Sequence, residues 1–448
     1  MTAREAVYKS LGEYRRNKLF TPASEKILEN PEVSERDKAL AWRIFLGVLQ
    51  NMSLCDFYAE SYSTIGIKKV EPRALDILRL SIYQIVFLKK IPHSAAVNEG
   101  VALARKHLNT SAAGYVNALL RRVADAVAIS RLPEPGGETA RRLSVKYSHP
   151  RWLVREIVLR LGAEGAEAFF SSNNSADMPF TAQVNTLKAD MGNVLSLLNA
   201  DGFQAAPHPW LDDCIQMRRP GKVETLNAFI KGYIYIQDPA SRLAVIAAGP
   251  KPGDTVLDGC SAPGGKAFAT AIAMGNTGSI TACDIKANKL RLIEDGARRL
   301  GISIIKTLER DSSIAEVATV SANGALYDIV IADVPCSGVG VIRRKPDIRY
   351  KDERDIEALP GIQRKLITGL SKSVKPGGVL LYSTCTVLKN ENEDVVGWFL
   401  NENAQFSAEA FVLPGIGEIP GGMTTLWPHI HGTDGFFICK LRKKLRNL

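Results

Sequence analysis

Two cysteines in this sequence each follow an apolar run of the kind that forms a buried strand. Cys336 lies in residues 333–347 (DVPCSGVGVIRRKPD), and Cys385 lies in residues 381–386 (LYSTCT). A single cysteine at a strand end is usually a small core residue. Two cysteines that leave neighbouring strands beside a ligand pocket would instead allow a thiolate to attack a substrate carbon.

Residues 256–266 (VLDGCSAPGGK) predict a strand, a tight turn and the start of a helix. Gly264 and Gly265 let the backbone approach a ligand, and a helix N-terminus offers unpaired N–H groups. The run has neither the G-x-G-x-x-G spacing of a dinucleotide site nor the spacing of a P-loop. Asp284, 26 residues after Asp258, ends the next expected strand and could accept hydrogen bonds from both ribose hydroxyls. This pattern indicates a nucleoside cofactor without a pyrophosphate, and S-adenosylmethionine fits that description.

Two more carboxylates could face the same pocket. Asp333 ends an apolar run and is expected to point into the cleft, while Pro335 stiffens the turn that presents Cys336. Asp311 follows the third expected strand and could accept from an adenine amino group. Its local sequence alone favours an ordinary loop residue.

The thiols restrict the reaction that this pocket could perform. Methylation of oxygen or nitrogen needs no thiol, whereas C5 of a cytosine is a poor nucleophile. A thiolate that adds to C6 makes C5 enamine-like, so that C5 can attack a sulfonium methyl group. A proton must then leave C5 before the bond between enzyme and base can break. The chemistry requires one attacking thiolate and does not say which cysteine supplies it.

The charge of the chain indicates a polyanionic partner. The formal net charge is +10, and residues 1–150 hold 23 basic and 15 acidic side chains, against 34 and 32 in residues 151–448. A solvated basic surface would have the same composition, but a basic half beside a near-neutral half is typical of nucleic-acid binding. The candidate RNA contacts are Arg121 and Arg122, at the end of an expected helix, and Arg343, Arg344, Lys345 and Arg349, downstream of Cys336.

The predicted elements divide the chain into three domains. Residues 1–135 predict helices only, with Leu75, Leu78, Ile82 and Ile85 on one helical face, and they end in a Pro- and Gly-rich breaker. Residues 145–245 predict a small α+β domain, expected to bind RNA. Residues 246–448 alternate strands and helices, which predicts a mostly parallel sheet covered on both faces. The expected strands are 255–257, 279–283, 304–308, 328–331, 378–382 and 436–439.

Several classes of protein are excluded. Hydrophobic residues make up 46% of the chain and charged residues 23%, the balance of a folded globular protein. No apolar run approaches a membrane span, and the N-terminus lacks the pattern of a signal peptide. The seven cysteines form no C-x-x-C motif, which argues against a disulfide framework or a zinc site and favours free thiols in the cytoplasm. His429 and His431 lack a third metal ligand nearby in sequence, so we expect no metal.

Four motifs in this order resemble those of the Sun/NOL1/NOP2 family of RNA (cytosine-5)-methyltransferases: LDGCSAPGGK, ACDIKANKL, DVPCSGVGVIRRKPDIR and STCTVLKNENEDVV. The helical N-terminus is similar to the NusB antitermination fold. A NusB-like bundle before such a core is the arrangement of bacterial 16S rRNA (cytosine-5)-methyltransferases of the B type. The resemblance covers nearly the whole chain and implies a Rossmann-like class I methyltransferase domain at the C-terminus.

The resemblance also implies roles for individual residues. Cys385 would be the nucleophile, Cys336 would assist release of the methylated base, Asp333 would hold the cytosine edge, and Lys266 would support the active-site loops. The cofactor would be S-adenosylmethionine. The residues implied to bind it are Cys260, Ser261, Ala262, Pro263, Gly264, Gly265, Lys266, Asp284, Asp311 and Asp333. For Asp311, the resemblance thus implies a role that its local sequence does not suggest.

The resemblance implies 16S rRNA, or an assembly intermediate of the small subunit, as the partner, and we expect the protein to be a monomer. Ser261 stands where the family usually has Ala, and Gln183 stands where an Arg is common, which leaves one expected RNA contact open. Three alternatives remain. They are methylation of another rRNA position or of tRNA, a non-catalytic NusB-like RNA-binding factor, and a nicotinamide oxidoreductase, which the missing G-x-G-x-x-G disfavours.

Overall fold

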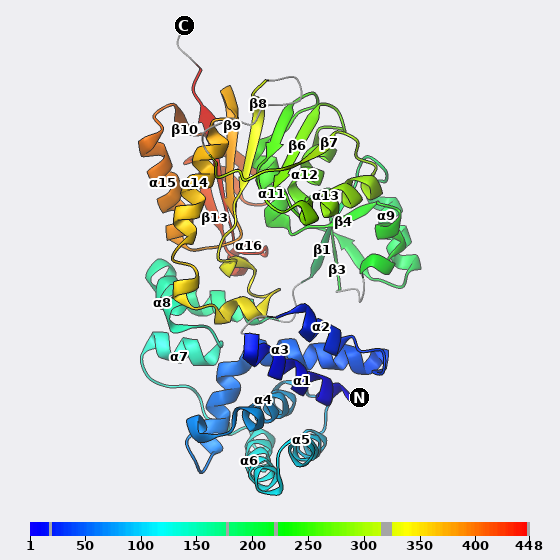
Figure 1. Cartoon of the computed structure of the whole chain (residues 1–448), viewed down its shortest axis with the longest axis vertical. Coiled ribbons are helices and arrows are strands. Elements are labelled where there is room, and N and C mark those ends of the chain that lie inside the picture. The colour runs from blue at the N-terminus through cyan, green and yellow to red at the C-terminus, as the bar shows by residue number, and fades with distance from the viewer. Residues whose placement is uncertain (18–19, 176–178, 219–222, 315–324, 446–448) are drawn as a thin grey trace. The chain divides into compact units, whose positions relative to one another are not determined.

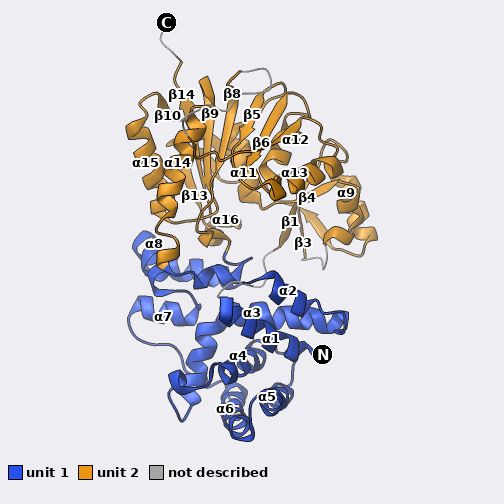
Figure 2. Ribbon diagram, in the orientation of Figure 1, with its two compact units in different colours: residues 1–175, 342–352 blue, residues 176–341, 353–448 orange. Residues whose placement is uncertain are grey.

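The computed structural model describes residues 1–17, 20–175, 179–218, 223–314 and 325–445. It divides into two compact units (Figure 2). Unit 1 comprises residues 1–175 and 342–352, and unit 2 comprises residues 176–341 and 353–448. Residues 342–352, which directly follow the segment that carries Cys336, therefore belong to the N-terminal unit.

Unit 1 is helical. Its elements are α1 (Ala3–Asn17), α2 (Pro22–Leu28), α3 (Glu35–Tyr62), η1 (Ile67–Lys69), α4 (Pro72–Phe87), α5 (His93–His107), α6 (Thr110–Ala128), α7 (Thr139–Lys146), α8 (Arg151–Asn174) and η4 (Pro346–Tyr350). Capping residues define where several of these helices begin. The side chains of Thr21, Ser34 and Asn109 each accept a hydrogen bond from a backbone N–H in the first turn of the helix that follows. Pro22 and Pro72 are the first residues of α2 and α4.

The core of unit 1 joins helices α1 to α6. The side chains expected to share one face of α4 lie in it, with Leu78, Ile82 and Ile85 buried and Leu75 packed at its edge. Among the described residues of 1–135 every regular element is a helix, as the sequence predicts. The expected boundary near residues 135–145 differs from the observed division at residue 175, because α7 and α8 pack within unit 1.

A small antiparallel sheet opens unit 2, in the order β2-β3-β1-β4. Its strands are β1 (Phe180–Val184), β2 (Ala205–Pro207), β3 (Cys214–Met217) and β4 (Ile234–Ile236), with α9 (Met191–Ala200), η2 (Val223–Thr225) and α10 (Asn227–Ile230) between them. Strands β1 and β4 and helix α9 match the expected α+β pattern. The short strands β2 and β3 were not anticipated.

The main sheet of unit 2 has the order β10-β14-β9-β8-β5-β6-β7, and β13 pairs with β14 (Figure 1). Strands β9, β8, β5, β6 and β7 are parallel, and β14 runs antiparallel to β9. The expectation of a mostly parallel sheet is confirmed. The strands are β5 (Thr255–Asp258), β6 (Ser279–Asp284), β7 (Ile305–Glu309), β8 (Tyr327–Asp333), β9 (Val374–Thr384), β10 (Phe406–Ala408), β13 (Met423–Leu426) and β14 (Phe436–Lys443).

Helices cover both faces of this sheet. Helices α11 (Pro239–Ala248), α12 (Gly265–Ala273) and α13 (Ala287–Leu300) share one core with strand residues such as Val256 and Ile331. Helices α14 (Leu359–Ser371) and α15 (Glu393–Glu402) share a second core with Leu257 and Val330. Adjacent strand residues thus enter opposite cores, as the two-residue period of a strand requires. The remaining elements are η3 (Val339–Val341), η5 (Glu353–Asp355), η6 (Lys389–Glu391), β11 (Phe411–Leu413), β12 (Gly417–Ile419) and α16 (Pro428–His431).

Candidate active site

The two cysteines expected at strand ends lie together. Parallel strands β8 and β9 place Asp333 beside Ser383 in register, so the loops that follow leave the same edge of the sheet. The Sγ atoms of Cys336 and Cys385 are 3.1 Å apart, and both side chains are partly exposed. The structure therefore places the two thiols side by side.

Close backbone contacts hold the two cysteine loops against each other. The N–H of Gly340 donates to the carbonyl of Cys385 at 3.0 Å, and the N–H of Gly435 donates to the carbonyl of Gly340 at 2.9 Å. A Cβ atom on Gly340 would lie 1.8 Å from the Gly435 oxygen, so only glycine permits this approach. Ser337 and Thr386 add a hydroxyl–hydroxyl bond of 2.8 Å between the loops.

A buried carboxylate supports the same loops from behind. Glu391 accepts from the Ser337 N–H at 2.9 Å and from Gln363 at 2.8 Å, and Gln363 also donates to the carbonyl of Pro335 at 3.1 Å. The sequence analysis assigned no role to Glu391. Its position in the acidic run NENED (residues 390–394), shortly after Cys385, was the one feature of the sequence that could have indicated a supporting role.

Cys336 is held in its protonated form. Its hydrogen bond with Cys385 raises the pKa of Cys336 well above the usual range, and burial and the charges of Cys385 and Glu391 add to the increase. Because the thiolate is the nucleophilic form, a thiol that keeps its proton is a poor nucleophile but can still donate a hydrogen bond.

Lys266 and Asp333 form an ion pair next to the thiol loops. Lys266 Nζ lies 2.7 Å from Asp333 Oδ2, and Ser383 donates to Asp333 Oδ1 at 2.8 Å. The Lys266 side chain comes from α12 and also lies over the ring of Phe436, 5.0 Å from its centre. The structure thus brings together Cys336, Cys385, Asp333 and Lys266, which the sequence placed at one site.

The loop between β5 and α12 has a tightly folded backbone. The Ala262–Pro263 bond is cis, Gly264 has φ +107°, and a Cβ atom there would lie 2.5 Å from the Phe268 ring. The N–H of Ser261 donates to the carbonyl of Cys283, which ties the loop to β6. Asp258 is 1% exposed, and burial together with the charge of Asp333 raises its pKa to about 7.

The residues expected to bind the cofactor fit a nucleoside ligand. The Asp258 carboxylate and the Ser261 hydroxyl are both buried beside this loop, and a hydrogen bond from the Ser261 side chain partly offsets the effect of burial on the pKa of Asp258. Asp284 ends β6, where it accepts from the N–H of Lys286 and lies 3.8 Å from Lys289. Asp311 accepts from the N–H and hydroxyl of Ser313, which lowers its pKa and orients the carboxylate at the end of β7.

The candidate RNA contacts fall into two groups. Arg121 and Arg122 are exposed on α6, Arg344 and Lys345 are exposed in unit 1, and Arg343 is partly buried there. Arg349, also expected to contact RNA, differs from these exposed side chains. It is 1% exposed and donates to neutral oxygens of unit 1, so its guanidinium cannot reach a phosphate in this structure.

The structure also bears on two other points of the sequence analysis, the glutamine at position 183 and the histidines near the C-terminus. Gln183, which stands where an arginine was expected, is buried and donates to the Gln237 carbonyl and to Cys214 Sγ. His431 accepts the Trp427 N–H at the start of α16. Over the ranges that the structure describes, no cluster of three or more His, Cys, Asp or Glu side chains is arranged to hold a metal ion. None of the helices described there is long and apolar enough to cross a membrane.

Comparison with known proteins adds family assignments for each part of the chain. Residues 245–442 match the 16S rRNA methyltransferase RsmB/F family, residues 1–125 match the NusB family, and residues 149–224 match a ferredoxin-like domain of RsmF/B-like methyltransferases.

Individual relatives span almost the whole length. The chain is 34% identical to the probable ribosomal RNA small subunit methyltransferase B of Bacillus subtilis, over 93% of each chain. It is 30% identical to the Synechocystis protein of the same name, over 99% of this chain and 100% of the other. Among solved structures, PH0851 matches with a TM-score of 0.77 and 29% identity, covering 98% and 97% of the two chains.

The parallel sheet, the glycine-rich loop after β5 and the carboxylates that end β5 and β6 define a Rossmann-like methyltransferase domain, preceded by a NusB-like helical domain and a small ferredoxin-like domain. With the full-length relatives above, the chain belongs to the ribosomal RNA small subunit methyltransferase B family.

Proposed function

We propose that this protein transfers a methyl group from S-adenosylmethionine to C5 of a specific cytosine in 16S rRNA, through a covalent bond between Cys385 and C6 of the base. The observation that carries the proposal is the pair of thiols 3.1 Å apart beside the Lys266–Asp333 ion pair. Methylation of an oxygen or nitrogen atom would need neither thiol.

Cys385 begins the reaction. Its thiolate adds to C6, and the electron pair of the C5–C6 double bond moves to C5, which attacks the methyl carbon. S-adenosylmethionine supplies an electrophilic methyl group and leaves as S-adenosylhomocysteine. Asp333, oriented by Lys266 and Ser383, accepts a hydrogen bond from the cytosine edge.

Cys336 assists the second half of the reaction. A base removes the proton from C5, the C5–C6 double bond forms again, and the bond from C6 to Cys385 breaks to return the thiolate. Cys336 lies within hydrogen-bonding distance of the departing sulfur, so its S–H can stabilise the negative charge that develops there. The contact is symmetric, so the assignment of release to Cys336 and of attack to Cys385 follows the roles that the family resemblance implies.

The partners follow from the same residues and relatives. The buried oxygens of Asp258 and Ser261, with Asp284 and Asp311, suit a nucleoside cofactor. The relatives are named for the RNA of the small subunit, which supports 16S rRNA or an assembly intermediate as substrate. Free cysteines support a reducing cytoplasm as the location.

The test is to incubate the protein with radiolabelled S-adenosylmethionine and unmodified 16S rRNA, and then to map 5-methylcytosine by bisulfite sequencing. We expect label in one cytosine of the RNA. Label on an oxygen, or on a nitrogen of a base, would contradict the mechanism. Label in tRNA alone would keep the chemistry and change the substrate.

A further inference from the structure

Two consecutive residues of the run after Cys385 are fully buried although both are polar. Glu391 ends η6 and Asn392 directly precedes α15, and each has 0% of its surface exposed. Their neighbours Asn390 and Asp394 are exposed. Buried polar side chains are normally hydrogen-bonded, so the partners of this pair indicate what the pair does.

Glu391 holds the peptide groups on both sides of Cys336. Its Oε2 accepts from the N–H of Ser337 at 2.9 Å and from the side chain of Gln363 at 2.8 Å. The same Gln363 nitrogen donates to the carbonyl of Pro335 at 3.1 Å. The two residues that flank Cys336 are therefore attached to one buried carboxylate, directly or through a single glutamine.

Asn392 holds the residues on both sides of Cys385 in the same way. Its Oδ1 accepts from the Thr384 hydroxyl at 2.6 Å, and its Nδ2 donates to the carbonyl of Thr386 at 3.0 Å. An amide suits this position because it both accepts and donates, whereas an ionised carboxylate could not donate to the Thr386 carbonyl. The two residues that flank Cys385 are therefore bonded to one side chain.

The backbone of the pair is itself held in place within unit 2. The Tyr382 hydroxyl, from β9, donates to the carbonyl of Glu391 at 2.6 Å. The carbonyl of Asn392 accepts from the N–H of Val396 at 3.0 Å, in the first turn of α15. Because Glu391 and Asn392 are joined by a peptide bond, both cysteine loops are attached to the same short piece of backbone.

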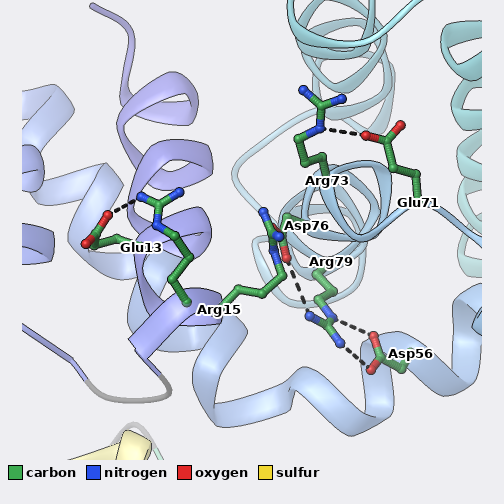
Figure 3. A network of polar contacts seen from close by, with 8 residues as sticks. Glu13, Arg15, Asp56, Glu71, Arg73, Asp76 and Arg79 are labelled. Atoms are coloured by element: carbon green, nitrogen blue, oxygen red, sulfur yellow. Dashed lines mark hydrogen bonds and ion pairs between the residues drawn. The ribbon is translucent and has the colours of Figure 1, made fainter.

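Glu391 lacks the cation that accompanies another buried carboxylate of this chain. Asp76, in α4, is 1% exposed and pairs with Arg15 at 3.0 Å and with Arg79 at 3.5 Å (Figure 3). The carboxylate of Glu391 accepts from neutral donors, and among the described residues it forms no ion pair. A buried carboxylate without a cation costs folding free energy. Such a cost is typical of functional sites, where local geometry takes precedence over stability.

We propose that Glu391 and Asn392 are positioning residues, Glu391 for the thiol of Cys336 and Asn392 for the thiol of Cys385. This inference rests on the proposed covalent mechanism. Because each residue holds one cysteine loop, each affects one half of the reaction. Asn392 supports the attack on C6, and Glu391 supports release of the methylated base. Both side chains are fully buried, so they act through the residues that flank the cysteines.

The test uses full-length Glu391→Ala and Asn392→Ala. The matched controls are Glu402→Ala and Asn401→Ala, because Glu402 and Asn401 are exposed residues at the end of α15. Each control removes the same type of side chain as its test variant, from a surface position. A difference between a test variant and its control therefore reports on the buried pair.

Hydrogen exchange of peptides covering residues 336–341 reports on the two loops without any substrate. The N–H of Gly340 is bonded to the carbonyl of Cys385, so its exchange requires the loops to separate. We expect exchange of this N–H to be roughly 10-fold faster in Glu391→Ala and in Asn392→Ala, the effect of losing buried hydrogen bonds. Both controls should exchange as the wild type does.

Reaction with 16S rRNA and S-adenosylmethionine separates the two halves of the mechanism. Asn392→Ala should transfer methyl groups roughly 10-fold more slowly and accumulate no covalent species, because attack is the impaired step. Glu391→Ala should accumulate a covalent protein–RNA species on a denaturing gel, as Cys336→Ala should. KM for S-adenosylmethionine should be unchanged in both variants, and a general loss of stability would not produce this division between steps.

Two results would overturn the proposal. One is wild-type exchange at Gly340 in folded Glu391→Ala and Asn392→Ala proteins. The other is the same amount of covalent species in both variants, or more of it in Asn392→Ala, because the two residues would then not act on separate cysteines.

A second pair of variants keeps the test decisive if an alanine variant does not fold. Gln363→Met removes the donor shared by Glu391 and Pro335, and Thr384→Val removes the hydroxyl bonded to Asn392, so each carries the same measurements. If Cys336→Ala formed no covalent species, the proposed mechanism would fail. The exchange data would still decide whether Glu391 and Asn392 position the loops.

Discussion

Replacing Gly340 with alanine should disrupt the thiol site more than any other single methyl group added there. The new Cβ would lie 1.8 Å from the carbonyl oxygen of Gly435 and 2.9 Å from that of Cys385. Both neighbours are backbone atoms, so no side-chain rotation can relieve the overlap. The loops that follow β8 and β9 would have to separate.

The size of the effect follows from these distances. Real Cβ contacts are essentially never below 3.0 Å, so the gap to Gly435 must open by at least 1.2 Å, the difference between 3.0 and 1.8 Å. Overpacking of this kind costs about 1–3 kcal/mol of folding free energy. A displacement of about 1 Å at reacting groups can cost about 100-fold in rate, because the thiols, which lie 3.1 Å apart, would move beyond hydrogen-bonding distance of each other.

Two measurements check this prediction. Urea unfolding should show the loss of stability, and transfer of labelled methyl groups to 16S rRNA should fall about 100-fold while binding of S-adenosylhomocysteine is retained. Gly397→Ala in α15 is the matched control, because a Cβ there meets no atom within 4 Å. A Gly340→Ala protein with wild-type stability and activity would refute the packing described for the two loops.

Three further predictions concern the cofactor, the pH dependence and the RNA. Asp284→Ala should weaken S-adenosylhomocysteine binding by about 1.5–3 kcal/mol in calorimetry, and unchanged affinity would place the ribose elsewhere. Because burial raises the pKa of Asp258 from 3.8 to about 7, wild-type stability should fall as the pH rises through that interval. Asp258→Asn should therefore gain stability relative to wild type as the pH rises from about 5 to about 8, by about 3 kcal/mol in urea unfolding, and a constant difference would contradict the buried ionisation. The double variant Arg121→Ala, Arg122→Ala should reduce the salt slope of RNA binding by up to about 1.8, at about 0.9 for each phosphate that is no longer neutralised, and an unchanged slope would exclude α6 from the RNA surface.

Much of the fold could be predicted from the sequence because its signals are local. The amphipathic period of α4 and the alternation of strands and helices after residue 246 depend only on neighbouring residues. The short strands β2 and β3 have no such signal, because their pairing depends on β1, which lies elsewhere in the chain. The place of residues 342–352 in unit 1 depends on contacts made about 300 residues away.

The candidate site was likewise predictable only where the sequence signal is local. Strand ends at a common edge predict that Cys336 and Cys385 meet, and the distance of 3.1 Å agrees with that prediction. A basic run in sequence does not reveal burial, so nothing in residues 343–349 distinguishes the buried Arg349 from the exposed Arg344 and Lys345. The support that Glu391 provides was missed, since its partners come from separate loops and helices.

The proposed mechanism depends most directly on which cysteine bonds to the base. The measurement is a denaturing gel of Cys385→Ala and Cys336→Ala, each incubated with S-adenosylmethionine and unmodified 16S rRNA. Cys385→Ala should transfer no methyl group and form no covalent species, because it cannot attack C6. Cys336→Ala should attack and then stall, leaving a protein–RNA band that survives denaturation. A shifted band from Cys385→Ala and none from Cys336→Ala would reverse the assignment, and no band from either variant would contradict the covalent mechanism.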